Sequence, residues 1–398
     1  MRLGDIIEIK HGYAFSGDHI IEEDNNVVLV TPGNFRIGGG FQEKKCKFFN
    51  GDLPSDYILN EGDFIVTMTD LSKTIDTLGY SAIVPKSKNR IYLHNQRIGL
   101  VHFKNDICDR GYIYWLMRTR DYQRTIANTS TGSTVHHTSP SKIYDYEFET
   151  PDKATQHRVA SILFHYDSLI ENYQKQIKLL EESAQRLYKE WFVDLRFPGH
   201  GNTKIVNGVP EGWEKKSIAD LGTYLNGFAF KPSDWQERGK PIIKIKEMGN
   251  GISTDTPRNN GERVPEKYLI KSGDLLFSWS ATLMVIVWTG EEGWLNQHLF
   301  KVTPTQGIGR EFLLQSISKT IAEFSNLTTG STMKHIQRNK LEQVFVNTPT
   351  SEIMNCYCRI AERQREQILN ISSQIRHLTE ARDRLLHKLM SGEINVNR

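Results

Sequence analysis

Residues 159–191 read VASILFHYDSLIENYQKQIKLLEESAQRLYKEW, and this stretch decides the fold. Apolar side chains recur in it at alternating intervals of four and three residues, with no proline or glycine between the first and the last. This spacing is the a/d pattern of a coiled coil and predicts one stiff helix of ~48 Å at 1.5 Å per residue. The predicted seam consists of Val159, Leu163, Tyr166, Ile170, Tyr173, Ile177, Leu180, Ala184, Leu187 and Trp191.

A second helix of the same kind is predicted 198 residues later. Gln364 and Arg382 interrupt its apolar stripe. Each stripe needs an apolar partner, so we expect the two helices of one chain to pack on each other as an antiparallel coiled coil. The alternative is that each helix forms a separate homodimeric coil. The second seam consists of Tyr357, Ala361, Ile368, Ile371, Ile375, Leu378, Leu385 and Leu389.

The two helices belong to a duplication of the whole chain. GYAF at 12–15 recurs as GFAF at 227–230, an offset of 215, and the later landmarks recur at 211 (Gly62), 201 (Asn95) and 198 (Thr131). From Thr131 onward the offset stays at 198 through the predicted helix. One part of each half therefore tolerates length differences while the other keeps its register, as expected of a symmetric frame that carries two different reading surfaces.

The segments outside the helices mix short β-rich runs with brief helices. Examples are 27–30, 63–67 and 283–288 for strands, and a helical stretch at 112–126 with a counterpart at 310–324. Proline and glycine in FPGHGN at 197–202 mark a linker. We therefore predict a mixed α+β chain with a pseudo-twofold internal repeat, in which two long antiparallel coiled-coil helices separate two globular α/β domains. Its expected parts are 1–151, the first domain; 152–196, a central helix; 197–349, the linker and second domain; and 350–398, a distal helix with a C-terminal tail.

Composition limits the functional classes. The chain is 38% hydrophobic with a net charge of +3, so it can bury real cores, and any nucleic-acid surface must come from local basic patches. No signal peptide and no apolar run of ~20 residues is visible, which favours a soluble, cytoplasmic protein. The four cysteines form no C-x-x-C pair and are expected to be reduced thiols.

Catalytic signatures are missing. The sequence has no P-loop, no third glycine of a dinucleotide loop and no Pro-Pro pair, so an ATPase and an amino-methyltransferase are both disfavoured. Glu43-Lys44-Lys45 has the E-x-K form of some nucleases, but such triplets are common in lysine-rich chains. His136 and His137 are adjacent and would point to opposite faces of a strand, so we expect neither a metal site nor a cofactor on this chain.

Side chains able to read DNA recur at matching places in the two halves. Cations suit phosphates, whereas amide, hydroxyl and guanidinium groups suit base edges. Read singly, the Thr-Gly-Ser-Thr segments are equally well simple turns, the Asn-Gln pairs are equally well buried ties, and the lysines of 44–47 are equally well a solvated face. The candidate DNA contacts are Lys44, Lys45, Lys47, Thr69, Lys73, Arg97, Thr134, His136, His137 and Lys142 in the first half, and Lys244, Lys246, Ser280, His298, Thr332, Lys334, His335, Arg338 and Lys340 in the second.

Over essentially its whole length the chain resembles the specificity subunit of type I restriction–modification systems. No single motif is specific, but their order, their duplication and the positions of the helices are. The motifs are LGD at 3–5, GYAF at 12–15, GD at 62–63, TGST at 131–134, Pro151 with Gln156, LYKEWFVD at 187–194, FPGH at 197–200, PEGWE at 210–214 and KLMSGEI at 388–394. The second half departs at Met354, which stands where the first half has Gln156.

The resemblance implies a non-catalytic subunit with two target recognition domains, each reading half of a bipartite, asymmetric site in double-stranded DNA. The helices would be spacers that bind two modification (methyltransferase) subunits. Those partners would carry S-adenosylmethionine, and restriction (translocase-nuclease) subunits would use ATP and Mg. The alternatives are a coiled-coil scaffold or adaptor that does not read DNA, and a cryptic methyltransferase or nuclease.

Overall fold

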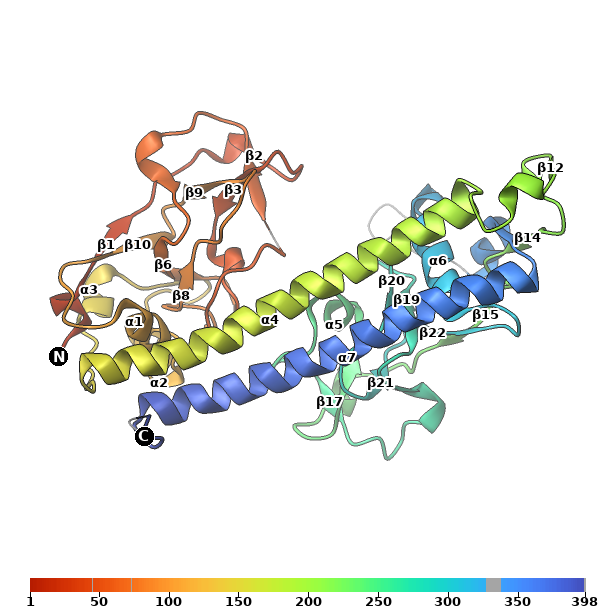
Figure 1. The fold of residues 1–398 in the computed structure, drawn as a ribbon. Helices are drawn as coiled ribbons and strands as arrows, with labels where there is room; N and C mark the ends of the chain where they lie inside the picture. Colours follow the sequence, from red (N-terminus) through yellow and green to blue (C-terminus); the bar gives the residue numbers. More distant parts are fainter. Residues whose placement is uncertain (45, 73, 327–337, 397–398) are drawn as a thin grey trace. The chain divides into compact units, whose positions relative to one another are not determined.

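The computed structural model describes residues 1–44, 46–72, 74–326 and 338–396. The chain forms two compact units: unit 1 contains residues 1–169 with 379–398, and unit 2 contains residues 170–378. Two long helices, α4 (Lys153–Tyr188) and α7 (Ser351–Met390), each contribute a segment to both units (Figure 1). In the described parts of the chain, neither these helices nor any other helix combines the length and the apolar character needed to cross a membrane.

The helices run antiparallel within each unit. In unit 1, Leu163 of α4 and Leu389 of α7 lie in one apolar core. In unit 2, Gln364 of α7 donates a hydrogen bond to Ser183 of α4 at 3.0 Å, so this interruption of the stripe is used as a polar tie. Every predicted seam residue is buried or half-buried. The predicted mutual packing is confirmed, and neither stripe is left over for a separate homodimeric coil.

The end of α4 departs from a regular α-helix. Residues Lys189–Val193 form one turn of π-helix. Because this turn is wider, it turns two consecutive aromatic side chains inward: Trp191 and Phe192 are 8% and 6% exposed. The Phe192 ring lies 4.9 Å from the rings of both Phe312 and Tyr357. The π turn therefore fastens the end of α4 to the core of unit 2.

Unit 1 contains two main sheets. Their strand orders are β1-β10-β6-β8 and β2-β4-β3-β9-β5, and a small pair joins β11 to β7. Among the described strands of these sheets, β3 and β9 pair in parallel and the other pairs are antiparallel. The strands are β1 (Ile7–His11), β2 (Ile20–Ile21), β3 (Val27–Val30), β4 (Lys47–Phe49), β5 (Ile58–Leu59), β6 (Phe64–Thr67), β7 (Thr69–Asp70), β8 (Ser81–Ile83), β9 (Ile91–His94), β10 (Ile98–Phe103) and β11 (His136–His137).

Unit 2 repeats the four-stranded sheet of unit 1 and, with one strand fewer among its described residues, the second sheet. Its sheets have the orders β15-β22-β19-β20 and β17-β16-β21-β18, and β16 with β21 is again the parallel pair. Two further pairs are β12–β13 and β14–β23. The strands are β12 (Ile205–Val206), β13 (Val209–Pro210), β14 (Glu214–Ser217), β15 (Gly222–Asn226), β16 (Lys240–Ile243), β17 (Arg258–Asn259), β18 (Leu269–Ile270), β19 (Leu275–Ser278), β20 (Met284–Val287), β21 (Gly293–Leu295), β22 (Leu299–Pro304) and β23 (Phe345–Thr348).

The strand limits follow the sequence repeat. β1 and β15 are 215 residues apart at both ends, β6 and β19 are 211 apart, and β10 and β22 are 201 apart. These are the offsets of the neighbouring landmarks, so the duplication predicted from the sequence is a duplication of fold.

The short helices differ between the units. The helical stretch predicted at 112–126 is two helices, α1 (Arg110–Leu116) and α2 (Arg120–Asn128), whereas its counterpart is the single helix α6 (Arg310–Asn326). Predicting one helix at 112–126 was wrong because Thr119 caps α2: its hydroxyl accepts from the Tyr122 amide, which starts a new helix. The remaining α-helices of the globular parts are α3 (Pro140–Tyr144) and α5 (Ile245–Asn250).

Glycine recurs at 12 and 227 for a steric reason. A Cβ atom on Gly12 would lie 2.2 Å from the carbonyl oxygen of Asn95, and one on Gly227 would lie 2.2 Å from that of Asn296. No side chain fits at such a distance, so each glycine is fixed by the Asn-Gln turn against which it packs. The glycine and the asparagine that recur in both halves of the sequence therefore recur because they pack against each other in both units.

The structure also accounts for the departure at Met354. Gln156 is buried at the start of α4; its Oε1 accepts from the Asp109 amide and its Nε2 donates to the Pro151 carbonyl, both at 2.8 Å. Met354 is equally buried but lies in the apolar core of unit 2. At this position the long helix is therefore held to the globular core by hydrogen bonds of Gln156 in unit 1 and by apolar packing of Met354 in unit 2.

Each unit fastens a long helix to its globular core through a buried ion pair. In unit 1, Asp167 of α4 binds Arg118 at 2.8 Å and also Arg382 of α7. Burial by itself raises the pKa of Asp167, but the two guanidinium groups outweigh it and hold the pKa below its usual value. In unit 2, Arg365 of α7 makes two bonds to Glu311 of α6, at 2.9 and 3.1 Å.

Asp167 and Arg365 occupy equivalent positions, 198 residues apart, with opposite charge. Each globular core therefore carries the charge that matches its own helix segment.

We predict that Glu311→Gln lowers the free energy of unfolding of the chain by roughly 3–5 kcal/mol, because it deprives the buried Arg365 of its hydrogen-bonded carboxylate and also removes the contact of Arg310 with that carboxylate. Urea denaturation followed by tryptophan fluorescence measures the change. The control is Glu182→Gln, which removes only long contacts to the exposed Lys178 and Arg186 and should cost at most about 1 kcal/mol. Equal losses for the two variants would contradict a supporting role of the buried pair.

Candidate nucleic-acid interface

Three segments that are distant in sequence meet at one edge of unit 1. The Met68 amide donates to the Arg97 carbonyl, and the Thr138 amide donates to the Met68 carbonyl, both at 3.0 Å. Beside them the Thr69 hydroxyl lies 3.1 Å from Nδ1 of His137, where β7 pairs with β11. Three of the predicted DNA contacts, Thr69, Arg97 and His137, thus lie together. We call this the reading edge of unit 1.

The turn at 95–97 displays two polar side chains from a buried anchor. Asn95 is 9% exposed, and its Oδ1 accepts from the Arg97 amide at 3.1 Å. Gln96 and Arg97 are exposed. Asn95 is therefore a buried hydrogen-bonding residue that holds the fold together, whereas Gln96 and Arg97 are accessible to a ligand.

His94 supports this turn from behind. It is buried, and its Nε2 lies 2.9 Å from the Ile98 carbonyl. Burial lowers the pKa of His94, so this imidazole is neutral at pH 7. A buried neutral ring adds no charge to the reading edge, so we assign His94 a structural role.

Unit 2 has the equivalent edge with other side chains. Asn296 Oδ1 accepts from the His298 amide at 3.3 Å, and the Ser280 hydroxyl lies 3.3 Å from Nδ1 of the same histidine. Next to it the Trp279 indole donates to Asn226 Oδ1 at 3.1 Å. By the offsets of the repeat, Asn226, Trp279 and His298 stand where unit 1 has His11, Met68 and Arg97. The sequence interpretation missed Trp279 and Asn226, although Trp279 directly precedes the recognised Ser280.

Thr69 and Ser280 are not displayed themselves. Each is 3% exposed, so in the absence of a ligand each acts through the histidine that it contacts. Behind them, the Thr67 and Ser278 hydroxyls donate to the carbonyls of Thr69 and Ser280, which fixes the same backbone shape in both units.

The other predicted contacts are scattered. Lys44, Lys47, Thr134 and Lys142 are exposed, and His136 is half-buried. Lys244 lies over the Trp235 ring at 5.4 Å, and Lys246 forms an ion pair with Asp255. Lys340 donates to Gln343 at 3.4 Å, and Arg338 begins a 3₁₀ turn. The predicted contacts Lys45, Lys73, Thr332, Lys334 and His335 lie outside the described residues.

Neither edge has the donors of a metal centre. Within residues 1–44, 46–72, 74–326 and 338–396 there is no group of three histidine, cysteine, aspartate or glutamate side chains placed to hold an ion. Cys46, Cys108, Cys356 and Cys358 are all free thiols. The groups that are present donate and accept hydrogen bonds, which suits recognition of a ligand surface.

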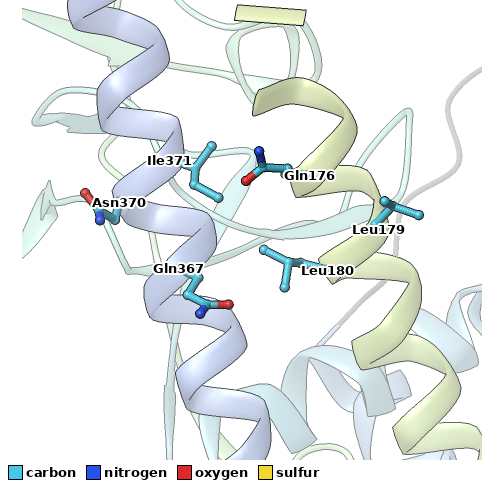
Figure 2. Close-up of a pocket in the computed structure, with 6 residues that line it drawn as sticks. All are labelled: Gln176, Leu179, Leu180, Gln367, Asn370 and Ile371. Atoms are coloured by element: carbon cyan, nitrogen blue, oxygen red, sulfur yellow. The ribbon is translucent and has the colours of Figure 1, made fainter. Parts of the chain in front are cut away.

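The long helices form a groove in unit 2, shown in Figure 2. It has a volume of about 400 Å³ and is open to solvent along the seam. Leu179 is 64% exposed, so an apolar side chain stands free beside the groove. The lining is Gln176, Leu179 and Leu180 from α4, with Gln367, Asn370 and Ile371 from α7.

Curated relatives are similar over most of the chain. The MjaIX type I restriction enzyme specificity subunit of Methanocaldococcus jannaschii is 25% identical over 317 residues, which cover 74% of this chain and 72% of that protein. The HindI specificity subunit of Haemophilus influenzae is 25% identical over 344 residues, covering 69% and 75%. The MjaVIII specificity subunit of M. jannaschii is 23% identical over 414 residues, covering 100% and 92%.

The fold is also that of a solved structure. The S subunit of a type I restriction–modification system from M. genitalium superposes with a TM-score of 0.52 at 14% identity, covering 98% of this chain and 95% of that one. The family model described as the type I restriction modification DNA specificity domain matches residues 1–182 and 210–380, one match in each half. The chain therefore belongs to the type I restriction–modification DNA specificity family: it is a non-catalytic specificity subunit, in a family whose S-adenosylmethionine and ATP are carried by partner subunits.

Proposed function

We propose that this subunit reads a bipartite, asymmetric site in double-stranded DNA, using the edge around Arg97 for one half-site and the edge around His298 for the other. The observation that carries the proposal is that both edges have the same backbone frame, set by Asn95 and Asn296, but present different side chains. Two domains that recognise different DNA sequences need this combination of a shared backbone conformation and different exposed side chains.

The chemistry of each edge suits base readout. A guanidinium such as that of Arg97 binds O6 and N7 of guanine, and an amide such as those of Gln96 and Gln297 binds N6 and N7 of adenine. The exposed Lys44, Lys47 and Lys142 would bind phosphates, which positions a protein on the duplex without selecting a sequence. We assign the other candidate contacts to the same two roles, within recognition domains at 1–151 and 197–349. The exceptions are Thr69 and Ser280, which are buried and act through a histidine, and Lys246, whose charge is paired with Asp255.

We predict that Arg97→Ala and His298→Ala relax opposite half-sites. Each loss should cost about 1–3 kcal/mol of discrimination at one or two base pairs of its own half-site and leave the other half unchanged. Methylome sequencing of cells that express the subunit with its modification subunits gives the site, and binding to duplexes randomised in one half measures the change. Lys178→Ala, on the outside of α4, is the control.

Two results would overturn this assignment. One is that both variants affect the same half-site. The other is that the complex shows no salt-dependent DNA binding at all, which would favour a scaffold that ignores DNA.

We further propose that α4 and α7 set the number of unread base pairs. α4 has 36 residues and α7 has 40, so at 1.5 Å per residue they extend ~54 and ~60 Å. One turn of B-DNA is ~34–36 Å. The helices exceed this length, so they are long enough to connect two recognition domains that bind the same face of a duplex one turn apart. Holding both readers on one chain also raises the effective concentration of the second at its half-site.

Insertion of seven residues into both helices, after Leu169 and after Leu378, should lengthen the unread spacer by about three base pairs, because seven residues add ~10.5 Å and a base pair rises ~3.4 Å. Methylome sequencing reads the new spacing directly. The same insertion in one helix only breaks the seam register and is expected to abolish modification. A changed half-site sequence at unchanged spacing would exclude the spacer role.

The groove of Figure 2 is the proposed docking site of a helical segment of a modification subunit. Type I complexes combine specificity subunits with modification and restriction subunits on DNA. The groove lies along two helices, and its lining combines apolar side chains with amides, which matches an amphipathic helix laid into a helical groove.

We predict that Leu179→Glu weakens association with the modification subunits at least ten-fold, because a carboxylate would be buried in an apolar contact. Since Leu179 is 64% exposed, the fold of the free chain should be preserved. Isothermal titration with the modification subunits measures the loss, and Ile107→Glu, 57% exposed in unit 1, is the control. Unchanged association for Leu179→Glu would place the docking surface elsewhere.

A further inference from the structure

The largest difference in length between the two halves falls in one loop beside the reading edge of unit 1. The offset of the repeat falls by ten residues between Gly62 and Asn95. Thirteen residues, 68–80, separate β6 from β8, whereas five residues, 279–283, separate β19 from β20. Eight of the ten additional residues therefore lie in the 68–80 loop.

This loop is held by a buried carboxylate. Asp70 is 1% exposed. Its Oδ1 accepts from the Ser72 amide at 2.6 Å, and its Oδ2 accepts from the amide and hydroxyl of Thr77 at 2.6 Å and from the Leu78 amide at 3.1 Å. Burial by itself raises the pKa of Asp70, but these donors outweigh it and the pKa lies below its usual value, so the carboxylate is charged at neutral pH.

Further contacts hold residues on both sides of Lys73, which lies outside the described residues. The hydroxyls of Ser72 and Thr74 both donate to the Asp76 carboxylate at 2.9 Å. Gln123 of α2 donates to the Ile75 carbonyl, and Leu78 is fully buried in the core of unit 1. These bonds hold the described part of the loop in one conformation, and loops held on a firm scaffold are the usual carriers of binding residues.

Leu71 differs from the other apolar side chains of this loop, which are buried or half-buried. Leu71 is 58% exposed, although it directly follows the buried Asp70. Asp70 pairs with His136 in the β7–β11 ladder, so Leu71 lies beside the reading edge. An exposed leucine on a pre-shaped loop offers an apolar contact with little loss of conformational entropy on binding.

We propose that the described residues of this loop, 68–72 and 74–80, form a specificity-determining element for the half-site read by unit 1, and that Leu71 contacts the methyl group of a thymine there. Thymine is the only base whose major-groove edge carries a methyl group, and apolar side chains recognise it. The inference rests on the proposed function, because it assigns one contact within the half-site that the reading edge of unit 1 would bind. Unit 2 lacks the loop, since Ala281 stands at the position of Asp70 and β20 begins three residues later.

The test combines protein and DNA substitutions. The complex of the full chain with its modification subunits is titrated onto duplexes in which each thymine of both half-sites is replaced in turn by uracil, which lacks the methyl group. One replacement, in the half-site of unit 1, should weaken binding by the unmodified chain about four-fold, the effect of leaving one methyl-sized group unburied. Leu71→Ala should bind about as weakly and be insensitive to that replacement. Fluorescence anisotropy gives the dissociation constants.

Matched variants separate this contact from general damage. Ile107→Ala removes an equally exposed apolar side chain, 57% against 58%, from the segment that follows the far end of β10, and it should keep the full response to uracil. Asp70→Asn replaces an acceptor by a donor that faces the Thr77 and Leu78 amides, so it should loosen the loop and relax only the half-site of unit 1.

The outcomes are distinguishable from failure of the proposed function. If Leu71→Ala keeps the uracil response, or if no thymine matters for the unmodified chain, the assignment of Leu71 is wrong while two-part recognition stands. If Leu71→Ala instead reduces association with the modification subunits, the loop contacts protein. If neither half-site is selected by the complex, the proposed function itself fails.

Discussion

The fold depends on the mutual burial of two apolar stripes along α4 and α7. A single helix with such a stripe would expose it to water, and a helix of 36 or 40 residues has no other means of covering it than a second helix and the globular cores. The middle of the seam is only half-buried, at Ile177 and Ile371. Its two ends are buried, at Leu163 with Leu389 in unit 1 and at Trp191 with Tyr357 in unit 2. The globular cores at the helix ends therefore cover the parts of the two stripes that are most deeply buried.

In a duplicated chain, the apolar stripes alone would not determine which helix segment packs on which globular core. The buried ion pairs supply that distinction, because Asp167 meets Arg118 and Arg382 whereas Arg365 meets Glu311. A core paired with the wrong helix segment would place like charges together in a buried site, at a cost of several kcal/mol. We expect these charges to favour the pairing of each core with its own helix segment, a role for buried ion pairs that does not depend on their adding net stability.

At the candidate interface, too, some residues fix the same backbone conformation in both units while others differ between them. The glycine–asparagine contacts at Gly12 and Gly227 fix the turn in both units, and the residue that ends the turn is free to differ, as Arg97 and His298 do. The 68–80 loop extends this principle, since an insertion in one unit is fixed in shape by its own carboxylate. Recognition can then be altered without altering the fold, because the residues that hold the backbone are distinct from those that face outward.

The sequence by itself determined the duplication, the two helices and their seams, and the family, because periodicity and repeated motifs are properties of local order. It also located the reading turns, since Asn95 and Asn296 recur with their glycines. What only the tertiary structure decided was the exposure of each candidate. Thr69 and Ser280 are buried, Lys246 is neutralised by Asp255, and Trp279 becomes part of an edge. Which side chains face a ligand depends on contacts between distant segments, and one-dimensional spacing does not contain those contacts.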